Sequence, residues 1–329
     1  MSKKDAYHPP FTITPSILRL VADISEATGR ISTRAENALD LRLRRINRIR
    51  TIQGSLAIEG NTLSEEQVTA ILDGKRVAAP LREIQEAKNA IAAYDRLEEW
   101  SPHSKYDLLT AHGILMAGLI DEAGHYRSGG VGVMGGGQVL HMAPPAKRVP
   151  MLMNDLLHWL VSTDYHPLVA GSVFHYEFEF IHPFSDGNGR MGRLWQTLIL
   201  YRWNAHFSGI SVESLIYEHQ SDYYEAIRKS TDNTDSSPFI EFMLQMIQNA
   251  VRTLDTPQVS PQVTPQVKRL LEVFRGEMTR DELMTTLGLK DRKSFRERYL
   301  RPALENGLIE MTLPDRPNSR LQRYRTVDR

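Results

Sequence analysis

Apolar residues recur at three- and four-residue spacing through most of the first 255 positions, which is the pattern of amphipathic helices. We expect helices at residues 52–58, 68–72, 84–97, 108–119, 151–160, 168–181, 194–200 and 239–251. Residues 129–142 differ, because two short alternating segments there flank the glycines at 135 to 137. Glycine supplies the positive φ that a tight turn requires, so this segment is predicted to be a β-hairpin.

A proline-rich spacer separates this helical part from the C-terminal part of the chain. Pro-Gln-Val occurs three times within residues 257–267, and proline opposes both helix and sheet pairing, which indicates an extended linker. Beyond it, apolar spacing and a capping box that starts at Thr279 predict three helices and then two strands, at residues 267–274, 279–288, 291–305, 309–313 and 321–327. This order of elements resembles a winged helix-turn-helix domain.

Composition narrows the classes of function. The chain contains no cysteine, which excludes disulfides, thiolate nucleophiles and cysteine-ligated zinc or iron–sulfur centres, and it fits a reducing compartment. No stretch approaches the roughly 18 apolar residues that span a bilayer, and the N-terminal residues lack the apolar run of a secretory signal. We therefore expect a cytoplasmic protein with no membrane partner.

Charge is balanced over the whole chain but not along it. Lys+Arg and Asp+Glu each number 40, whereas residues 257–329 contain 15 Lys+Arg and 10 Asp+Glu, a net charge of +5 that leaves −5 on the rest. The helix expected at residues 291–305 carries a cluster of these cations: Arg292, Lys293, Arg296, Arg298 and Arg301. DNA is therefore a candidate partner of this part of the chain. The competing interpretations are a solvated basic face and a module for homodimer or protein contacts.

Residues 181–193, Ile-His-Pro-Phe-Ser-Asp-Gly-Asn-Gly-Arg-Met-Gly-Arg, concentrate the candidate chemistry. A helix is expected to end at His182, because the proline after it disfavours the helical conformation there. The glycine-bearing loop that follows opens a second helix, and such a loop presents unpaired N–H groups to an anion. Arg190 and Arg193 share one helical face and can reach one polyphosphate. Asp186 suits magnesium, and His182 suits a general base.

The spacing HPFxDGNGRxxR in this segment is that of the Fic (fido) family, which the sequence closely resembles. The resemblance extends from about residue 50 to residue 251 and includes Gly-His-Tyr-Arg at 124–127 and Asp-Tyr-Tyr at 222–224. It implies a mainly α fold, with a Fic-type helical core, a β-hairpin flap and a C-terminal winged helix-turn-helix domain. The implied segments are an N-terminal helical region with an inhibitory helix, the Fic catalytic domain, a Pro-rich linker and the winged helix-turn-helix domain, at residues 1–103, 104–250, 251–266 and 267–329.

By this resemblance the protein is an enzyme, a protein adenylyltransferase that transfers AMP from ATP to a Ser, Thr or Tyr hydroxyl of a target protein or of another copy of the chain. His182 is then the catalytic base, and Asp186 holds Mg²⁺ between the α- and β-phosphates. Phe184 anchors the loop in the core, and the hairpin at residues 129–142 is a flap that pairs with the target backbone. The implied ATP-binding residues, with the two tyrosines lining the adenine pocket, are Asp186, Gly187, Asn188, Gly189, Arg190, Arg193, Tyr223 and Tyr224.

A second motif lies upstream, where Ser-Leu-Ala-Ile-Glu-Gly-Asn at residues 55–61 matches the inhibitory pattern (S/T)xxxE(G/N) of one Fic class. Glu59 falls in the last turn of a helix that Gly-Asn stops, where the helix dipole disfavours negative charge. A buried arginine partner would resolve this conflict, and the resemblance points to Arg193. Ser55 and Glu59 are therefore predicted to be inhibitory. The competing interpretation of Glu59 is a surface glutamate before a helix C-cap.

Other interpretations stay open. His175, Glu179 and His182 share a helical face and could bind a metal ion, although they supply only three ligands. The donor could be UTP or a phosphocholine carrier, because the phosphate loop does not read the base. The chain could also be a DNA-binding regulator whose Fic domain responds to a nucleotide without transferring it. Three further histidines are expected to be core or surface residues: His112, His158 and His166.

Overall fold

The computed structural model describes residues 7–32, 38–135, 138–255, 265–289, 291–305, 308–313, 319 and 321–326. The chain divides into two compact units, Met1–Thr256 and Pro257–Arg329. Each unit has its own hydrophobic core, so the packing of one does not depend on residues of the other.

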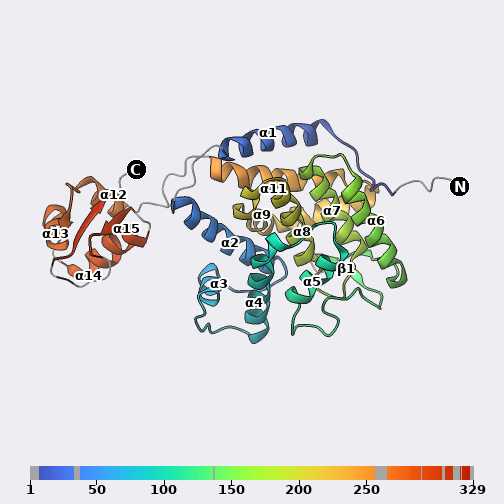
Figure 1. Cartoon of the computed structure of the whole chain (residues 1–329), viewed down its shortest axis with the longest axis horizontal. Coiled ribbons are helices and arrows are strands. Elements are labelled where there is room, and N and C mark those ends of the chain that lie inside the picture. Colours follow the sequence, from blue (N-terminus) through green and yellow to red (C-terminus); the bar gives the residue numbers. More distant parts are fainter. Residues whose placement is uncertain are drawn as a thin grey trace. The chain divides into compact units, whose positions relative to one another are not determined.

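The first unit is built almost entirely from helices, which is the mainly α fold that the sequence predicts (Figure 1). α7 (Pro167–Ile181) is buried on nearly all sides, since Phe180 is its only exposed side chain. A helix that is buried all round belongs in the interior, so α7 forms the centre of the unit. The other described α-helices of this unit are α1 (Pro15–Ser32), α2 (Ala38–Ile58), α3 (Glu65–Leu72), α4 (Leu81–Asp95), α5 (Lys105–Leu115), α6 (Val149–Ser162), α8 (Asn188–Trp203), α9 (Val212–Glu218), α10 (Gln220–Asn233) and α11 (Ser237–Asp255).

Packing around α7 brings the two sequence motifs together. α7 packs against α8 and α11, and α11 also runs along α1 (Figure 1). α2 packs closely on α9, because a Cβ at Gly54 would lie only 2.7 Å from the backbone nitrogen of Ser214. α2 also contacts α8. The end of α2, which carries the upstream motif, therefore meets the helix that follows the HPFxDGNGRxxR loop.

The hairpin expected at residues 129–142 is present as two antiparallel strands, β1 (Gly132–Gly135) and β2 (Gln138–Met142). Its register shifts between Val133 and Met134, which marks a β-bulge. β2 also contacts α10. The expected turn glycines at 136 and 137 lie outside the described residues.

The C-terminal unit has the three helices and two strands that the sequence predicts, and one further strand. Its elements, in chain order, are α12 (Pro265–Glu272), β3 (Met278–Thr279), α13 (Arg280–Leu287), a helical stretch made of α14 (Arg292–Phe295), a π-helical turn (Arg296–Leu300) and α15 (Arg301–Glu305), and then β4 (Ile309–Met311) and β5 (Arg323–Thr326). The strands form an antiparallel sheet in the order β3-β5-β4. The capping box predicted at Thr279 is present, with Glu282 bonded back to the Thr279 backbone. The third strand is only two residues long, too short to leave a pattern in the sequence.

Several predicted boundaries are wrong. The helix expected at residues 52–58 is the end of α2, which begins at Ala38. The helix expected to reach residue 119 ends at Leu115, because the chain turns at Gly118, where φ is 69°. Residues 251–255, assigned to the linker, continue α11 to Asp255, since Val251 is still buried on its apolar face. Of the nine residues between α11 and α12 nothing is described.

Three helices were missing from the prediction: α1, α9 and α10. α10 shows why, because only four of its fourteen residues are buried and the rest of its sequence is polar. Among the described helices, none is long and apolar enough to cross a membrane.

Candidate functional site

The HPFxDGNGRxxR loop joins two helices through two left-handed residues. His182 follows the last residue of α7 and adopts φ 50° and ψ 63°, as the proline after it opposes the right-handed helical conformation. Gly187 caps α8 with φ 83°. Asn188 closes the loop between them, because its amide accepts from Phe184 N and donates to Phe184 O, each at 2.9 Å. The backbone N–H groups at the start of α8 are thereby held at one place, as an anion site requires.

The underside of the loop is fixed by an aromatic stack. Phe184 is fully buried, as predicted, and lies flat on His112 with ring centroids 3.6 Å apart. His112 Nδ1 accepts a hydrogen bond from Gly124 N, so Nε2 carries the proton and donates it to Asp186 O at 3.0 Å. Burial lowers the pKa of His112 to about 4, which keeps the ring neutral. His112 is one of the three histidines expected to be core or surface residues, and it lies in the core. Its support of the loop had no sequence signal.

Arg127 holds the opposite side of the loop. Its side chain is 3% exposed and donates to four backbone carbonyls: His182 O, Gly129 O, Pro144 O and Ile181 O. Its own N–H donates to Pro183 O at 2.9 Å. Arg127 therefore connects the base of the β1–β2 hairpin to the strained backbone of His182.

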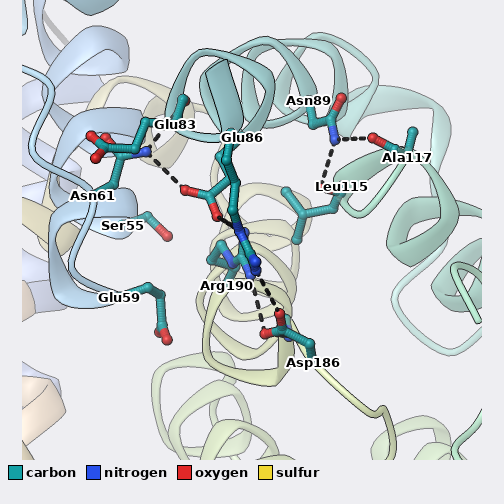
Figure 2. Close-up of polar contacts among 12 residues, drawn as sticks. Ser55, Glu59, Asn61, Glu83, Glu86, Asn89, Leu115, Ala117, Asp186 and Arg190 are labelled. Atoms are coloured by element: carbon teal, nitrogen blue, oxygen red, sulfur yellow. Dashed lines mark hydrogen bonds and ion pairs between the residues drawn. The ribbon is translucent and has the colours of Figure 1, made fainter. Parts of the chain in front are cut away.

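Arg190 is 5% exposed and lies between two carboxylates, as Figure 2 shows. Its Nη2 is 3.3 Å from Asp186 Oδ1 in the loop, and its Nη1 is 3.8 Å from Glu86 Oε1 on α4. Glu86 also accepts a hydrogen bond of 2.9 Å from Asn61, the residue that ends the upstream motif. Neither Glu86 nor its link to Asn61 had a signal in the sequence.

The side chain of Arg193 is only 1% exposed, and it faces the upstream motif. Its Nη2 donates to Glu59 Oε1 at 2.6 Å and to Ser55 O at 3.0 Å, and its Nε donates to Ser55 Oγ at 3.1 Å. Burial alone would lower the pKa of Arg193, but the Glu59 carboxylate outweighs it and the pKa is raised. Both predicted inhibitory residues thus bind the second arginine of the loop motif.

Glu59 lies directly over the start of α8. A Cβ at Gly189 would overlap Glu59 Oε1 and lie 3.0 Å from Arg193 Nη1, so a side chain there would displace the Glu59 carboxylate. The turn that carries Glu59 is held from two sides: Gln220 donates to Ile58 O at 2.7 Å, and Asn61 bonds to Glu86 on α4 (Figure 2). A carboxylate therefore occupies the place where the helix N-terminus and Arg193 would hold an anion.

The two predicted adenine-pocket tyrosines differ in exposure. Tyr223 is 2% exposed, and its hydroxyl lies 3.2 Å from His175 Nε2, so its side chain is part of the core rather than of an open pocket wall. Tyr224 is half-buried and its hydroxyl accepts from Gln220 at 3.4 Å. Of the pair, Tyr224 alone keeps surface for a ligand, and its contact with adenine stays a prediction.

Asp186 is the residue that could hold Mg²⁺. Its side chain is 42% exposed beside the anion site, although Arg190 and Arg82 lie 3.3 and 3.4 Å away. Mg²⁺ is commonly held by one or two carboxylates together with substrate phosphates and water, so a single accessible aspartate fits. No cluster of three or more His, Asp or Glu side chains within the described ranges has the arrangement of a metal site, which removes support for the His175, Glu179 and His182 alternative.

Two arginines of the basic helix in the C-terminal unit form ion pairs within the described residues. Arg292 pairs with Asp281 at 3.3 Å and Arg301 pairs with Glu297 at 3.5 Å. Three further cations of the predicted cluster are exposed: Lys293, Arg296 and Arg298.

The fold and the loop match one family. Residues 102–200 match the Fic/DOC family, and residues 265–326 match the family described as "Filamentation induced by cAMP protein Fic-like, C-terminal domain". A Fic family protein from Desulfovibrio desulfuricans G20 is 55% identical in sequence, with a TM-score of 0.75, and the alignment covers 98% of this chain and 99% of that one. The chain therefore belongs to the Fic family.

Curated relatives carry an enzyme name. "Protein adenylyltransferase Fic" from Aedes aegypti is 30% identical over 256 residues, which cover 70% of this chain and 48% of that protein. The protein of the same name from Nematostella vectensis is 30% identical over 226 residues, covering 65% and 49%. This chain thus spans about half the length of these relatives. Fic-1 from C. elegans, at 23% identity and a TM-score of 0.61 over 72% of this chain, shares the fold.

Proposed function

We propose that this protein is an adenylyltransferase that moves AMP from ATP to a Ser, Thr or Tyr hydroxyl of a protein, and that Glu59 inhibits it. The observation that carries the proposal is the position of the Glu59 carboxylate, bonded to Arg193 at the N-terminus of α8. Because a carboxylate fits there, the site is suited to anions, and the curated relatives are named for transfer of an adenylyl group.

The phosphates of ATP would lie over the start of α8. The N–H groups of Asn188 and Gly189 would face the α-phosphate, and Arg190 and Arg193 would hold the β- and γ-phosphates through charge-assisted hydrogen bonds. The third predicted loop residue, Gly187, donates its N–H to Asp186 Oδ1 at 2.6 Å and would have to exchange this partner for the α-phosphate. Asp186 would hold Mg²⁺, which neutralises phosphate charge when bound. These groups position the donor and stabilise charge, which supplies most of the catalysis in phosphoryl chemistry.

His182 would activate the target hydroxyl. Its Nδ1 donates to Glu179 O, so Nε2 is the nitrogen able to accept a proton. As the hydroxyl proton passes to Nε2, the hydroxyl oxygen forms a bond to the α-phosphorus. The bond from that phosphorus to the bridging oxygen breaks, and pyrophosphate leaves with the electron pair. The β1–β2 hairpin would present the target segment as an added strand.

Glu59 would inhibit by taking the contacts that the γ-phosphate makes with Arg193. ATP then binds only with its γ-phosphate displaced, and the α-phosphate is no longer in line with the attacking oxygen. A misplacement of about 1 Å can cost about 10²-fold in rate, so this displacement is enough to suppress transfer.

Mass spectrometry tests the reaction and the donor together. The Glu59→Gly variant is incubated with ATP, with UTP or with a phosphocholine-carrying nucleotide, alone and with a lysate, and modified peptides are identified. Glu59→Gly/His182→Ala is the matched control. We expect AMP on Ser, Thr or Tyr side chains with ATP and none in the control. Modification by another donor group, or ATP binding with no transfer, would contradict the proposal.

A second candidate function is DNA binding by the C-terminal unit. It is favoured by the exposed Lys293, Arg296 and Arg298 and by the net charge of +5 on residues 257–329. Binding of duplex DNA at several salt concentrations tests it. An affinity that falls steeply with salt in the wild type, and less so in Lys293→Ala/Arg296→Ala/Arg298→Ala, is expected for a DNA interface. Equal binding by the two proteins would exclude this face.

A further inference from the structure

Glu179 is a buried acid that the reaction described above does not use. It lies on α7, three residues before His182, and is 5% exposed. Its Oε2 is 3.8 Å from His182 Nδ1, and its Oε1 is 3.9 Å from His175 Nε2. Among the described residues Oε1 has no hydrogen-bond partner. Burying a carboxyl group without a full set of donors is costly, so its position beside the proposed base points to a function.

Gly192 leaves the space that this carboxyl group fills. A Cβ at Gly192 would lie 2.8 Å from Glu179 Oε1 and 2.8 Å from His175 Cδ2. A side chain at position 192 would therefore displace Glu179 or His175. The helix that bears both motif arginines thus keeps the carboxyl group against α7, next to His182.

The same residue contacts His182 through its backbone. The Nδ1 of His182 lies 3.3 Å from the carbonyl oxygen of Glu179. A carbonyl oxygen only accepts, so Nδ1 carries the proton and Nε2 is left to act as the base. The Nδ1–H edge of the ring thus faces Glu179 twice, through the carbonyl oxygen and through Oε2.

We propose that Glu179 is a positioning residue for His182, and that its carboxylate stabilises the imidazolium formed when Nε2 takes the proton of the target hydroxyl. The inference rests on the proposed adenylyl transfer and adds a residue outside the HPFxDGNGRxxR segment to it. The proton moves from the hydroxyl oxygen to Nε2, Nδ1 keeps its own proton, and no atom of Glu179 is transferred. An opposite charge within about 4–6 Å shifts such an equilibrium by about one to three pKa units.

The charge of Glu179 depends on the groups that surround it. Burial raises the pKa of Glu179 to about 8, while Arg193 lowers it and Glu59 raises it. Departure of the Glu59 carboxylate would free Arg193. It would also lower the pKa of Glu179, and so favour the ionised form of Glu179 beside His182. Among the described residues, the titratable and charged groups that face Glu179 come from four helices and their ends: His175 on α7, His182 directly after α7, Arg193 on α8, Glu59 directly after α2, and Tyr223 and Tyr224 on α10.

Kinetics of Glu179→Gln in the Glu59→Gly background test the proposal, with Glu177→Gln as the matched control. Glu177 lies on the same helix and is 6% exposed, but its carboxylate accepts from the Tyr7 hydroxyl at 2.7 Å instead of facing His182. We expect Glu179→Gln to lower kcat about tenfold, since one pKa unit corresponds to a factor of ten, with KM for ATP unchanged. It should also abolish the rise of kcat with pH that ionisation of Glu179 produces near or below pH 8. Equal kcat values and equal pH profiles for the two variants would overturn the proposal.

An NMR titration gives a readout that needs no catalysis. The ring nitrogens of His182, assigned with His182→Ala, should shift in two steps in the wild type, because interacting groups titrate as a pair. Glu179→Gln should leave one step, and Glu177→Gln should leave two. A single step in the wild type would overturn the proposal. A different outcome is two steps in the titration together with no AMP transfer by Glu59→Gly. That outcome would contradict the proposed function, and with it the part of Glu179 in proton transfer.

Discussion

Glu59 Oε1 accepts a hydrogen bond of 2.6 Å from Arg193 Nη2, although the two residues lie 134 positions apart in the chain. The Arg193 side chain is 1% exposed, whereas the Glu59 side chain is 37% exposed. Glu59 is therefore the partner that can break the ion pair, because water already reaches its carboxylate, whereas the buried Arg193 stays in place. A displaceable carboxylate on a fixed cation is suited to reversible inhibition.

Substituting His182 should separate binding from transfer. Glu59→Gly/His182→Ala is expected to bind ATP as Glu59→Gly does, since the anion site is built by the start of α8 and the two arginines. Its rate of AMP transfer should fall by about 10²- to 10⁴-fold, the usual worth of a general base. Isothermal titration calorimetry with ATP measures the binding, and incorporation of labelled AMP measures the rate of transfer. Unchanged transfer by the double variant would remove His182 from the mechanism.

Arg127→Lys should destabilise the fold and reduce activity. A lysine cannot reach all four carbonyls that Arg127 satisfies, and each buried hydrogen bond lost from a charged donor costs about 1.5–3 kcal/mol. Urea unfolding measures the first effect and kcat the second. Arg228→Lys is the control, because the ion pairs of Arg228 with Glu225 and Asp232 are exposed. Equal unfolding midpoints for the two variants would contradict the part assigned to Arg127.

Gln220→Ala should partly release the inhibition. Gln220 donates to the carbonyl of Ile58 at the end of α2, and the loss of one hydrogen bond of about 1 kcal/mol corresponds to about a fivefold shift toward the released state. We expect AMP transfer at saturating ATP to rise by about that factor, well below the gain in Glu59→Gly. Gln245→Ala, which removes an amide bonded to Gln248 and Asn249 on α11, should leave the rate unchanged. No gain in Gln220→Ala would show that this contact does not hold the inhibitory turn.

Stability should fall as pH rises through the titration of Glu179. Burial raises the pKa of this group from 4.5 to about 8, so the unfolded chain loses the proton more readily than the folded one. Its contribution to stability is then fully present below about pH 4.5 and lost progressively up to about pH 8. The difference in the free energy of unfolding between wild type and Glu179→Gln, measured at pH 5, 7 and 9, should follow this course. A difference independent of pH would contradict it.

The sequence was informative where a local pattern fixes the chemistry. The loop motif predicted the helix end at His182 and the buried Phe184, because both are decided within twelve residues. The apolar run of α7 and the capping box at Thr279 were equally local, and both are present.

Contacts between distant elements could not be predicted in this way. His112 beneath Phe184 and Glu86 beside Arg190 lie on helices with no motif of their own, and only packing brings them to the loop. The polar α10 escaped detection because its apolar positions are few. The burial of Tyr223 likewise depends on α7 and α11, through His175 and Phe239, which the sequence pattern cannot place.

The most direct test of the inhibited adenylyltransferase is labelled-AMP incorporation by wild type, Glu59→Gly and Glu59→Gly/Arg193→Ala, at equal protein concentration and saturating ATP. Removing the carboxylate should raise the rate by about 10²-fold, since correct placement of the α-phosphate is worth about that much, and removing Arg193 as well should abolish the gain. A Glu59→Gly variant no more active than the wild type would contradict the inhibitory role of Glu59. A double variant as active as the single one would contradict the part of Arg193.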